Sequence, residues 1–221
     1  MQKSLQSFFA KVYGWMFLGL IVTATAASLT AFIPTLQTAI LGNSFLMIGL
    51  IVLELITVII MSFFLNKMPP IVAILCFLFF ALVNGLTLSV VFLVYELGSI
   101  YLAFFLTAGI FGLMSLFGFF TKMDLSKLGT ILFIGLIGVI LASIVNFFLK
   151  SSGFEYTLSI ITIIIFIGLT AYDTQKLKKI AEKEITDQAS ETRVAIFGAL
   201  SLYLDFINLF LRILEIFGKK R

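Results

Sequence analysis

The apolar run GALSLYLDFINLFLRILEIFG near the C-terminus is interrupted by Asp205, Asn208, Arg212 and Glu215. A charged side chain that faces hydrocarbon costs about 2.5–3.5 kcal/mol even on the lenient insertion scale. On a helical wheel these residues share a sector about 80° wide with Ser201, and we call this set the polar seam. A helix with one narrow polar seam and an apolar remainder belongs inside a bundle, so the sequence predicts that the seam faces protein or water.

The polar seam has a structural and a functional interpretation. Arg212 can pair with Glu215 at i+3, and Asn208 can hydrogen-bond a neighbouring helix, which would make these residues structural. Asp205 differs, because its nearest cation on the same helix is two turns away. Asp205 is therefore the seam residue for which the structural interpretation is weakest.

Other apolar runs carry polar residues that could partner the seam. Asp173 ends one run in FIGLTAYDTQ, so it is either an interfacial residue solvated beside Lys176 or part of a site. Glu54 lies in the middle of LIVLELITV, as a neutral hydrogen-bonded carboxyl or as part of an ion site. Asn84 and Asn146 lie inside two further runs, and we expect them to be supporting polar groups or to line a pathway.

The composition excludes several classes of protein. Of 221 residues, 61% are hydrophobic and 12% are charged, whereas a soluble domain is about 25% charged. The chain has no histidine, the commonest ligand of zinc and the usual switch near neutral pH, and Cys76 is its one cysteine. The motifs GxSxG, GxxxxGK[ST] and HExxH do not occur, so the sequence predicts neither an enzyme nor a cofactor. The net charge of +4 arises in short connections, which indicates membrane orientation and no nucleic-acid partner.

The sequence predicts an all-α polytopic membrane protein, a seven-helix bundle that forms a single transmembrane domain over residues 1–221. A membrane helix needs about 20 apolar residues, and the candidate spans are 13–33, 45–65, 71–95, 99–120, 129–149, 156–175 and 196–217. Residues 176–195 are expected to form a polar loop. The pairs Ala108/Gly112 and Gly138/Ala142 are expected to allow close helix packing.

Lysine and arginine in the connections predict a cytoplasmic N-terminus, because positive charge collects on the inner side of a membrane. The inner connections then hold Lys3, Lys11, Lys67, Lys122, Lys127, Lys176, Lys178, Lys179, Lys183 and Arg193, against Lys150, Lys219, Lys220 and Arg221 outside. An odd number of spans puts the basic tail outside. A six-span arrangement with a re-entrant last segment would place it inside.

Several stretches resemble the Bax inhibitor (transmembrane Bax inhibitor motif) family over essentially the whole chain. GLTAYDTQKLK at 168–178 and GALSLYLDFINLFLRIL at 198–214 are similar to its paired signature. AKVYGWMFLGL at 10–20, TAGIFGLMSLFG at 107–118 and LIGVILASIVNFFLK at 136–150 resemble its bacterial YbhL/YccA-like branch.

The resemblance implies a bundle whose last helix is central and a location in the bacterial inner membrane. It also implies that Asp173 and Asp205 face one another as a proton-sensitive, di-aspartyl pair. Some bacterial relatives have a basic cluster after the second span that latches one aspartate. This chain departs from that pattern, because only Lys67, in FFLNKMPP, stands there.

The resemblance further implies a pH-dependent calcium leak pathway, and the hypothesis for this chain is therefore a pH-sensitive calcium leak channel. Two carboxylates a few ångströms apart cannot easily both ionise, so they share a proton. Loss of this proton leaves hard oxygen ligands suited to calcium, which makes Asp173 and Asp205 the candidate calcium ligands. Asn208 is a candidate lining of the same pathway. The alternative is a membrane-embedded interaction protein that modulates a membrane protease, or a cell-death or quality-control partner, without transport.

Overall fold

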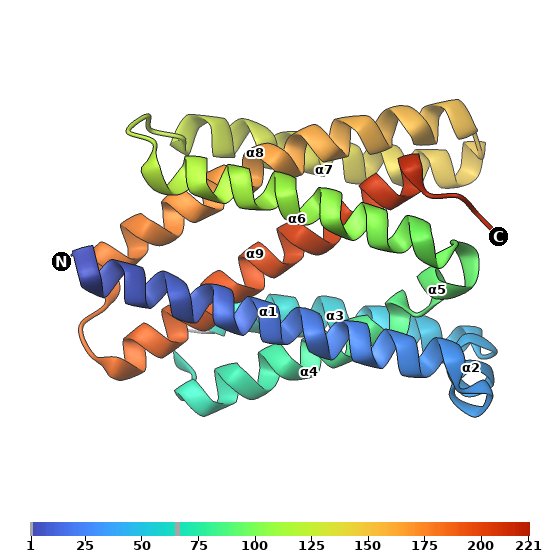
Figure 1. Ribbon diagram of the computed structural model, residues 1–221, viewed down its shortest axis with the longest axis horizontal. Helices are drawn as coiled ribbons and strands as arrows, with labels where there is room; N and C mark the ends of the chain where they lie inside the picture. The colour runs from blue at the N-terminus through green and yellow to red at the C-terminus, as the bar shows by residue number, and fades with distance from the viewer. Residues whose placement is uncertain (1, 65–66) are drawn as a thin grey trace. The chain divides into compact units, whose positions relative to one another are not determined.

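The computed structural model describes residues 2–64 and 67–221, and nearly all of this part of the chain is helical (Figure 1). The helices are α1 (Gln2–Phe32), α2 (Pro34–Leu41), α3 (Ser44–Phe64), α4 (Pro70–Leu88), α5 (Val90–Val94), α6 (Leu97–Phe120), α7 (Ser126–Leu149), α8 (Ser152–Glu184) and α9 (Gln188–Phe217).

Seven helical segments of the described chain are long and apolar enough to cross a membrane, as the sequence predicted. They are Leu5–Phe32, Ser44–Phe64, Pro70–Val94, Leu97–Phe120, Ser126–Leu149, Ser152–Lys183 and Gln188–Phe217. The protein is an all-α polytopic membrane protein. The last segment is the most enclosed, with 61% of its apolar window buried. Because α9 is a continuous helix, the six-span alternative with a re-entrant end is wrong.

The expectation of a polar loop over residues 176–195 is also wrong. The helix α8 continues to Glu184, and α9 already begins at Gln188. The segment KLKKIAEKE is made mainly of strong helix formers, so its polarity does not end the helix. Two reciprocal hydrogen bonds start α9: the Ser190 N–H donates to Asp187 Oδ1 over 2.6 Å, and the Asp187 N–H donates to Ser190 Oγ over 3.0 Å. The first of these bonds holds the pKa of the Asp187 carboxyl below its ordinary value.

The three prolines mark helix starts. Pro34 is the first residue of α2 and Pro70 the first residue of α4, positions at which the missing N–H costs no helical hydrogen bond. Pro69 is the N-cap of α4. The apolar runs are thus separated into helices by prolines and short polar turns, which is why the number of spans could be read from the sequence.

The chain forms two compact units. Unit 1 comprises Met1–Glu96, Ile180–Tyr203 and Lys220–Arg221, and unit 2 comprises Leu97–Lys179 and Leu204–Lys219. In unit 1, α4 packs against both α1 and α3 (Figure 1). Unit 2 contains α6, α7, most of α8 and the C-terminal half of α9. Each of the two acidic side chains of interest in α8 and α9, Asp173 and Asp205, belongs to unit 2.

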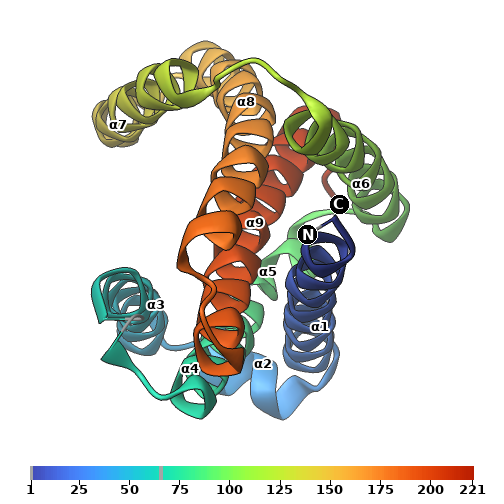
Figure 2. The same cartoon turned by 90° about the vertical axis from the view of Figure 1, so that its left-hand side faces the viewer.

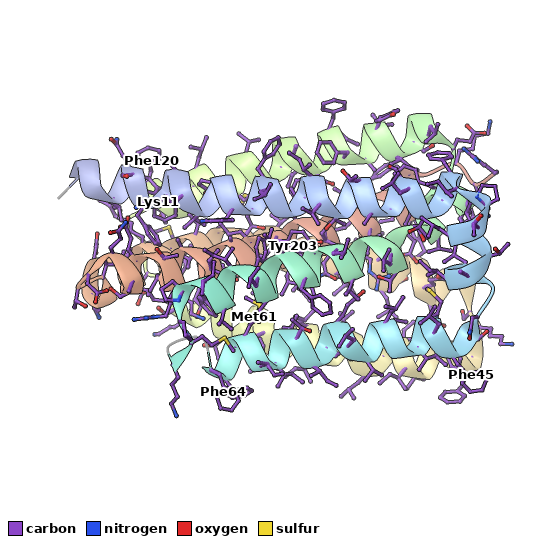
Figure 3. The ribbon with its side chains drawn as sticks, turned by 90° about the horizontal axis from the view of Figure 1, so that it is seen from below. Lys11, Phe45, Met61, Phe64, Phe120 and Tyr203 are labelled. Atoms are coloured by element: carbon purple, nitrogen blue, oxygen red, sulfur yellow. The ribbon has the colours of Figure 1, made fainter. Side chains whose placement is uncertain are left out.

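Large apolar side chains cover the outer faces of the helices. In α3, Phe45 and Phe64 stand at opposite ends and are 89% and 52% exposed (Figure 3). The windows of Ser44–Phe64 and Ser126–Leu149 are each only 11% buried. Exposed apolar surface on this scale requires an apolar solvent, so the lipid bilayer is the surrounding of this protein.

Close helix packing occurs at glycines other than those expected. A Cβ at Gly112 or Gly138 would meet nothing within 4 Å, so the expectation of close contact at these positions is wrong. Instead, a Cβ at Gly118 of α6 would collide with the backbone of Ala171 in α8, and one at Gly129 would collide with the ring of Tyr172. Spacing of small residues alone could not show which faces of the helices meet.

We expect Gly118→Ala to destabilise the protein by about 1–3 kcal/mol, because the added methyl group overpacks the α6–α8 contact. The matched control is Gly112→Ala on the same helix, where open space surrounds the position. The control is expected to be neutral or slightly stabilising, since alanine favours helix over glycine by about 0.8–1.0 kcal/mol. Unfolding of both variants in detergent is the measurement, and equal stabilities would contradict the close contact.

Candidate functional site

The candidate aspartates belong to α8 and α9, and α6 of the same unit contacts both of these helices (Figure 2). The rings of Phe104 and Phe111 on α6 each lie 5.5 Å from the ring of Phe206 on α9. Gly118 meets Ala171, so α6 also touches α8. The helices α8 and α9 are joined by the Ser159 hydroxyl, which donates to Glu215 Oε2 over 2.7 Å. The part of α9 in this unit, which carries Asp205, is therefore in contact with both α6 and α8.

Asp205 is 4% exposed, and its Oδ2 atom has no hydrogen-bond partner in the described part of the chain. Asp173 is half-buried, and its charge acts on the Asp205 carboxyl. A buried polar atom without a partner is uncommon and costs about 1–3 kcal/mol. The two carboxyl groups lie in one unit, and no hydrogen bond within the described residues accounts for Asp205 Oδ2.

The signature segment AYDTQKLK docks the connection between α6 and α7. Gln175 is buried; its Oε1 accepts from the Leu125 N–H over 2.9 Å, and its Nε2 donates to the Met123 carbonyl over 2.7 Å. Lys178 Nζ donates to the carbonyl of Phe119 over 3.1 Å. These hydrogen bonds of Gln175 and Lys178 could not be predicted from the sequence, because the partners are backbone atoms about 50 residues away. Gln175 and Lys178 fix the loop beside Asp173.

Lys179 pairs with Asp124 at 2.6 Å in the same connection, and both side chains are largely exposed. The hydrogen bond from Lys179 is the main cause that lowers the pKa of Asp124 to about 2. The pKa is lowered in the folded state. The contribution of the Asp124 carboxylate to the free energy of unfolding is therefore fully present above a pH of about 3.9, the ordinary pKa of aspartate. This contribution is lost as the pH falls through about 2.

We expect Lys179→Ala to raise the pKa of Asp124 toward its ordinary value, since the charged donor is gone. The Ser126 bonds to Asp124 remain in this variant and leave part of the shift in place. A carboxyl-carbon NMR titration in detergent measures the change, with Asp187 as an internal control that should not move. A pKa of Asp124 that stays at about 2 would contradict the pairing.

The C-terminal half of the polar seam contains the Arg212–Glu215 ion pair that its structural interpretation predicts. Arg212 Nη1 donates to Glu215 Oε2 over 2.7 Å, and Ser159 donates to the same oxygen. Asn208 Nδ2 donates to the carbonyl of Leu204 on its own helix over 2.8 Å. Arg212 and Glu215 therefore have partners within the protein, whereas Asp205 Oδ2 does not.

Two adjoining cavities lie beside the C-terminal half of the polar seam. The larger, about 600 Å³, lies among α7, α8 and α9 and is lined by apolar side chains together with Ser143, Thr162, Asn208 and Arg212. The smaller, about 440 Å³, is lined by Ser143, Asn146, Phe147, Lys150, Ser152, Glu155, Leu158 and Arg212. Ser143, Phe147 and Arg212 border both cavities. Polar groups of the seam thus face space that could hold water.

Glu54 belongs to a hydrogen-bonded cluster in unit 1. Its Oε1 accepts from Thr87 over 2.6 Å, and its Oε2 accepts from Asn84 Nδ2 over 3.2 Å. Asn84 Oδ1 accepts from the hydroxyl of Tyr203 over 2.8 Å, and Tyr203 also meets Thr23 Oγ1 at 2.6 Å. Both carboxyl oxygens of Glu54 have protein partners, so the structure accounts for Glu54 and Asn84 without an ion.

A role for Tyr203 was not predicted from the sequence, although this residue stands in the same signature segment as Asp205. It is fully buried, and the rings of Phe77 and Phe80 on α4 lie 6.0 and 5.8 Å from its ring (Figure 3). A tyrosine in an apolar run gives no signal of its own. Its partners, on α1 and α4, are brought to it by the fold.

The two remaining site candidates are Lys67 and Asn146. Lys67 is exposed in the connection between α3 and α4, and no ion pair of Lys67 occurs among the described residues. Asn146 Oδ1 accepts from the Ser151 N–H over 3.2 Å at the end of α7, where Lys150 adopts a left-handed conformation. Asn146 therefore caps a helix end as well as lining the smaller cavity.

No group of three or more cysteine and acidic side chains that could hold a metal ion occurs in the part of the chain that the structure describes. A calcium ion takes 6–8 oxygen ligands, and two carboxylates supply at most four. Calcium bound at Asp173 and Asp205 would need further oxygens from water or from neutral side chains.

The apolar seven-helix architecture, with a buried carboxyl group in its last helix, defines a polytopic membrane protein. A family model described as inhibitor of apoptosis-promoting Bax1 matches residues 5–221. The chain belongs to the Bax inhibitor family, as its signature segments predicted. It is 47% identical over 218 residues to the inner membrane protein YbhL of Escherichia coli, covering 98% of this chain and 93% of that protein.

Further relatives are similar along their whole length. A protein of Borreliella burgdorferi is 41% identical over 97% of this chain and 92% of its own length. A membrane protein of Streptococcus pyogenes is 37% identical over 97% of this chain and 93% of its own length. The names of the Escherichia coli and Streptococcus pyogenes relatives describe membrane proteins, and none of the three names includes an enzymatic activity.

Proposed function

We propose that this protein is a calcium leak channel of the bacterial inner membrane, with a cytoplasmic N-terminus, whose conduction depends on protonation of Asp173 and Asp205. The observation that carries the proposal is the Oδ2 atom of Asp205, which is buried without a partner and lies within the field of a second carboxyl group. In contrast, the carboxyl groups of Glu54 and Glu215, which also lie within membrane-spanning helices, accept hydrogen bonds from protein side chains.

The mechanism uses the two aspartates as a proton-sensitive clasp between α8 and α9. With one proton held, the pair can share it and the helices stay together. With the proton lost, the two negative charges repel, and their oxygens become hard ligands for a divalent cation. Passage needs the cation alone and no cofactor, and the proposed activity is passive transport without catalysis.

The cavities along the seam supply the outer part of the proposed pathway. Asn208 and Arg212 line the larger cavity, which begins one turn from Asp205, and Asn146 lines the smaller one. The positive charge of Arg212 would repel a cation, but Glu215 pairs with it at 2.7 Å and offsets that charge. Water in the larger cavity would therefore meet a mostly apolar wall, and the charge of Arg212 in that wall is offset.

The test is calcium uptake into proteoliposomes that contain the purified chain, measured over a pH series. We expect wild-type flux to change with pH and expect Asp173→Asn and Asp205→Asn each to remove that dependence, because an amide does not titrate in this range. If both variants kept the wild-type pH profile, the proton-sensitive pair would be wrong. If the pure wild type carried no flux, the interaction protein would be the better reading.

A further inference from the structure

The two adjoining cavities of unit 2 differ in the chemistry of their walls. The larger cavity is lined mainly by apolar side chains of α7 and α8. Two polar residues of its wall, Thr162 and Asn208, already donate to carbonyl groups of their own helices, over 2.6 and 2.8 Å. The larger cavity therefore offers few hydrogen bonds to water, and its wall suits a hydrocarbon chain.

The smaller cavity lies where α7 ends and α8 begins, and charges of both signs line it. Lys150 and Arg212 supply the positive charges, and Glu155 supplies the negative one. The side chain of Lys150 has no ion-pair or hydrogen-bond partner among the described residues. Arg212 has five N–H donors, and its bond to Glu215 uses Nη1. A carboxylate has about four acceptor sites, so Glu155 can accept from a ligand in addition to its contacts within the protein. Donors for a phosphate and an acceptor for an amine therefore face the same space.

The length and the opening of the two cavities match one leaflet of a bilayer. Lys150 caps the end of α7, and Leu136 of the larger cavity stands 14 residues earlier, which is about 21 Å along the helix. Half of the hydrocarbon core of a bilayer is about 15 Å thick. Ile144 and Phe147 line the larger cavity and are 54% and 76% exposed, whereas Val139 is buried. The larger cavity therefore opens toward the surrounding lipid and ends at buried side chains.

We propose that the two cavities bind one phospholipid with an ethanolamine head group, which places an acyl chain in the larger cavity and the head group in the smaller one. The phosphate accepts hydrogen bonds from Lys150 and Arg212, and the ammonium group donates to Glu155. A choline head group lacks the N–H donors and a glycerol head group lacks the positive charge, so the smaller cavity favours ethanolamine. The bound acyl chain excludes water from the larger cavity and closes the outer part of the proposed pathway, but the binding itself does not rest on the proposed function.

The experiment is native mass spectrometry of the purified full-length chain, titrated in detergent with ethanolamine, choline and glycerol phospholipids that carry identical acyl chains. We expect the ethanolamine lipid to bind more tightly than the other two lipids by about tenfold, the effect of one charge-assisted hydrogen bond. Lys150→Gln and Glu155→Gln should each weaken its binding by a similar factor. Lys127→Gln is the matched control, because this exposed lysine stands at the start of α7, away from both cavities, and it should leave the binding unchanged.

Ile144→Trp tests the position of the acyl chain, because it enlarges an exposed side chain in the wall of the larger cavity. It should weaken binding of the ethanolamine lipid, whereas Leu141→Trp, at an exposed position of α7 outside the cavity wall, should not. If the three lipids bound equally well, or if Ile144→Trp bound the ethanolamine lipid as wild type does, the contacts would be unselective contacts with bilayer lipid and the inference would be overturned. Selective lipid binding without calcium flux would contradict the proposed function alone, and flux without selective binding would contradict this inference alone.

Discussion

Asp205→Val is expected to make the protein more stable by about 1–3 kcal/mol at a pH where the aspartate pair has lost its proton, because it removes a buried, repelling carboxyl group whose Oδ2 atom has no partner among the described residues. Valine and aspartate have similar helix propensities, so the change tests the burial of the carboxyl group and little else. The same variant should lose the pH-dependent part of the calcium flux. A gain in stability with a loss of activity is the pattern of a residue kept for function.

Glu215→Leu on the same helix is the control with the opposite expected sign. It leaves Arg212 without its ion-pair partner inside the membrane and removes an acceptor from Ser159, so it should destabilise the protein. Reversible unfolding in mixed detergent micelles measures both variants. If Asp205→Val were as destabilising as Glu215→Leu, Asp205 would be structural packing like the rest of the seam, and the proton-sensitive pair would lose its main support.

Asn84→Leu is expected to destabilise the protein by about 2–6 kcal/mol, because two side-chain hydrogen bonds of one buried cluster are lost together. The substitution removes the donor to Glu54 Oε2 and the acceptor for the Tyr203 hydroxyl together. Both partners are held in unit 1 by helices packed on α4, so the cluster cannot easily rearrange around the leucine. Unfolding in mixed micelles is again the measurement.

A graded series checks that hydrogen bonding within the cluster causes this loss. Tyr203→Phe removes the hydroxyl alone and should cost about 1–3 kcal/mol, less than Asn84→Leu. Tyr101→Phe, at a side chain that is 61% exposed, should be neutral. Full stability of Asn84→Leu would show that the cluster does not hold α3, α4 and α9 together.

Much of the fold followed from the sequence because the bilayer imposes a simple rule. In hydrocarbon, every backbone polar group must be paired within the segment, so long apolar runs become helices. The seven runs, the prolines between them and the narrow polar seam of the last helix therefore predicted an all-α membrane bundle. The bounds were less accurate: α8 and α9 extend through residues 176–184 and 188–195, because helix formers continue a helix after its apolar part ends.

The roles of the polar residues depended on contacts between distant segments. The sequence alone determined that Asp205, Arg212 and Glu215 share one face of a helix, because a helix repeats every 3.6 residues. Only the tertiary structure decided that Glu215 has partners and Asp205 Oδ2 does not, and that Glu54 is bonded to Asn84 and Thr87. The physical reason is that a hydrogen bond depends on distance and direction between two helices, and neither is encoded in the periodicity of one.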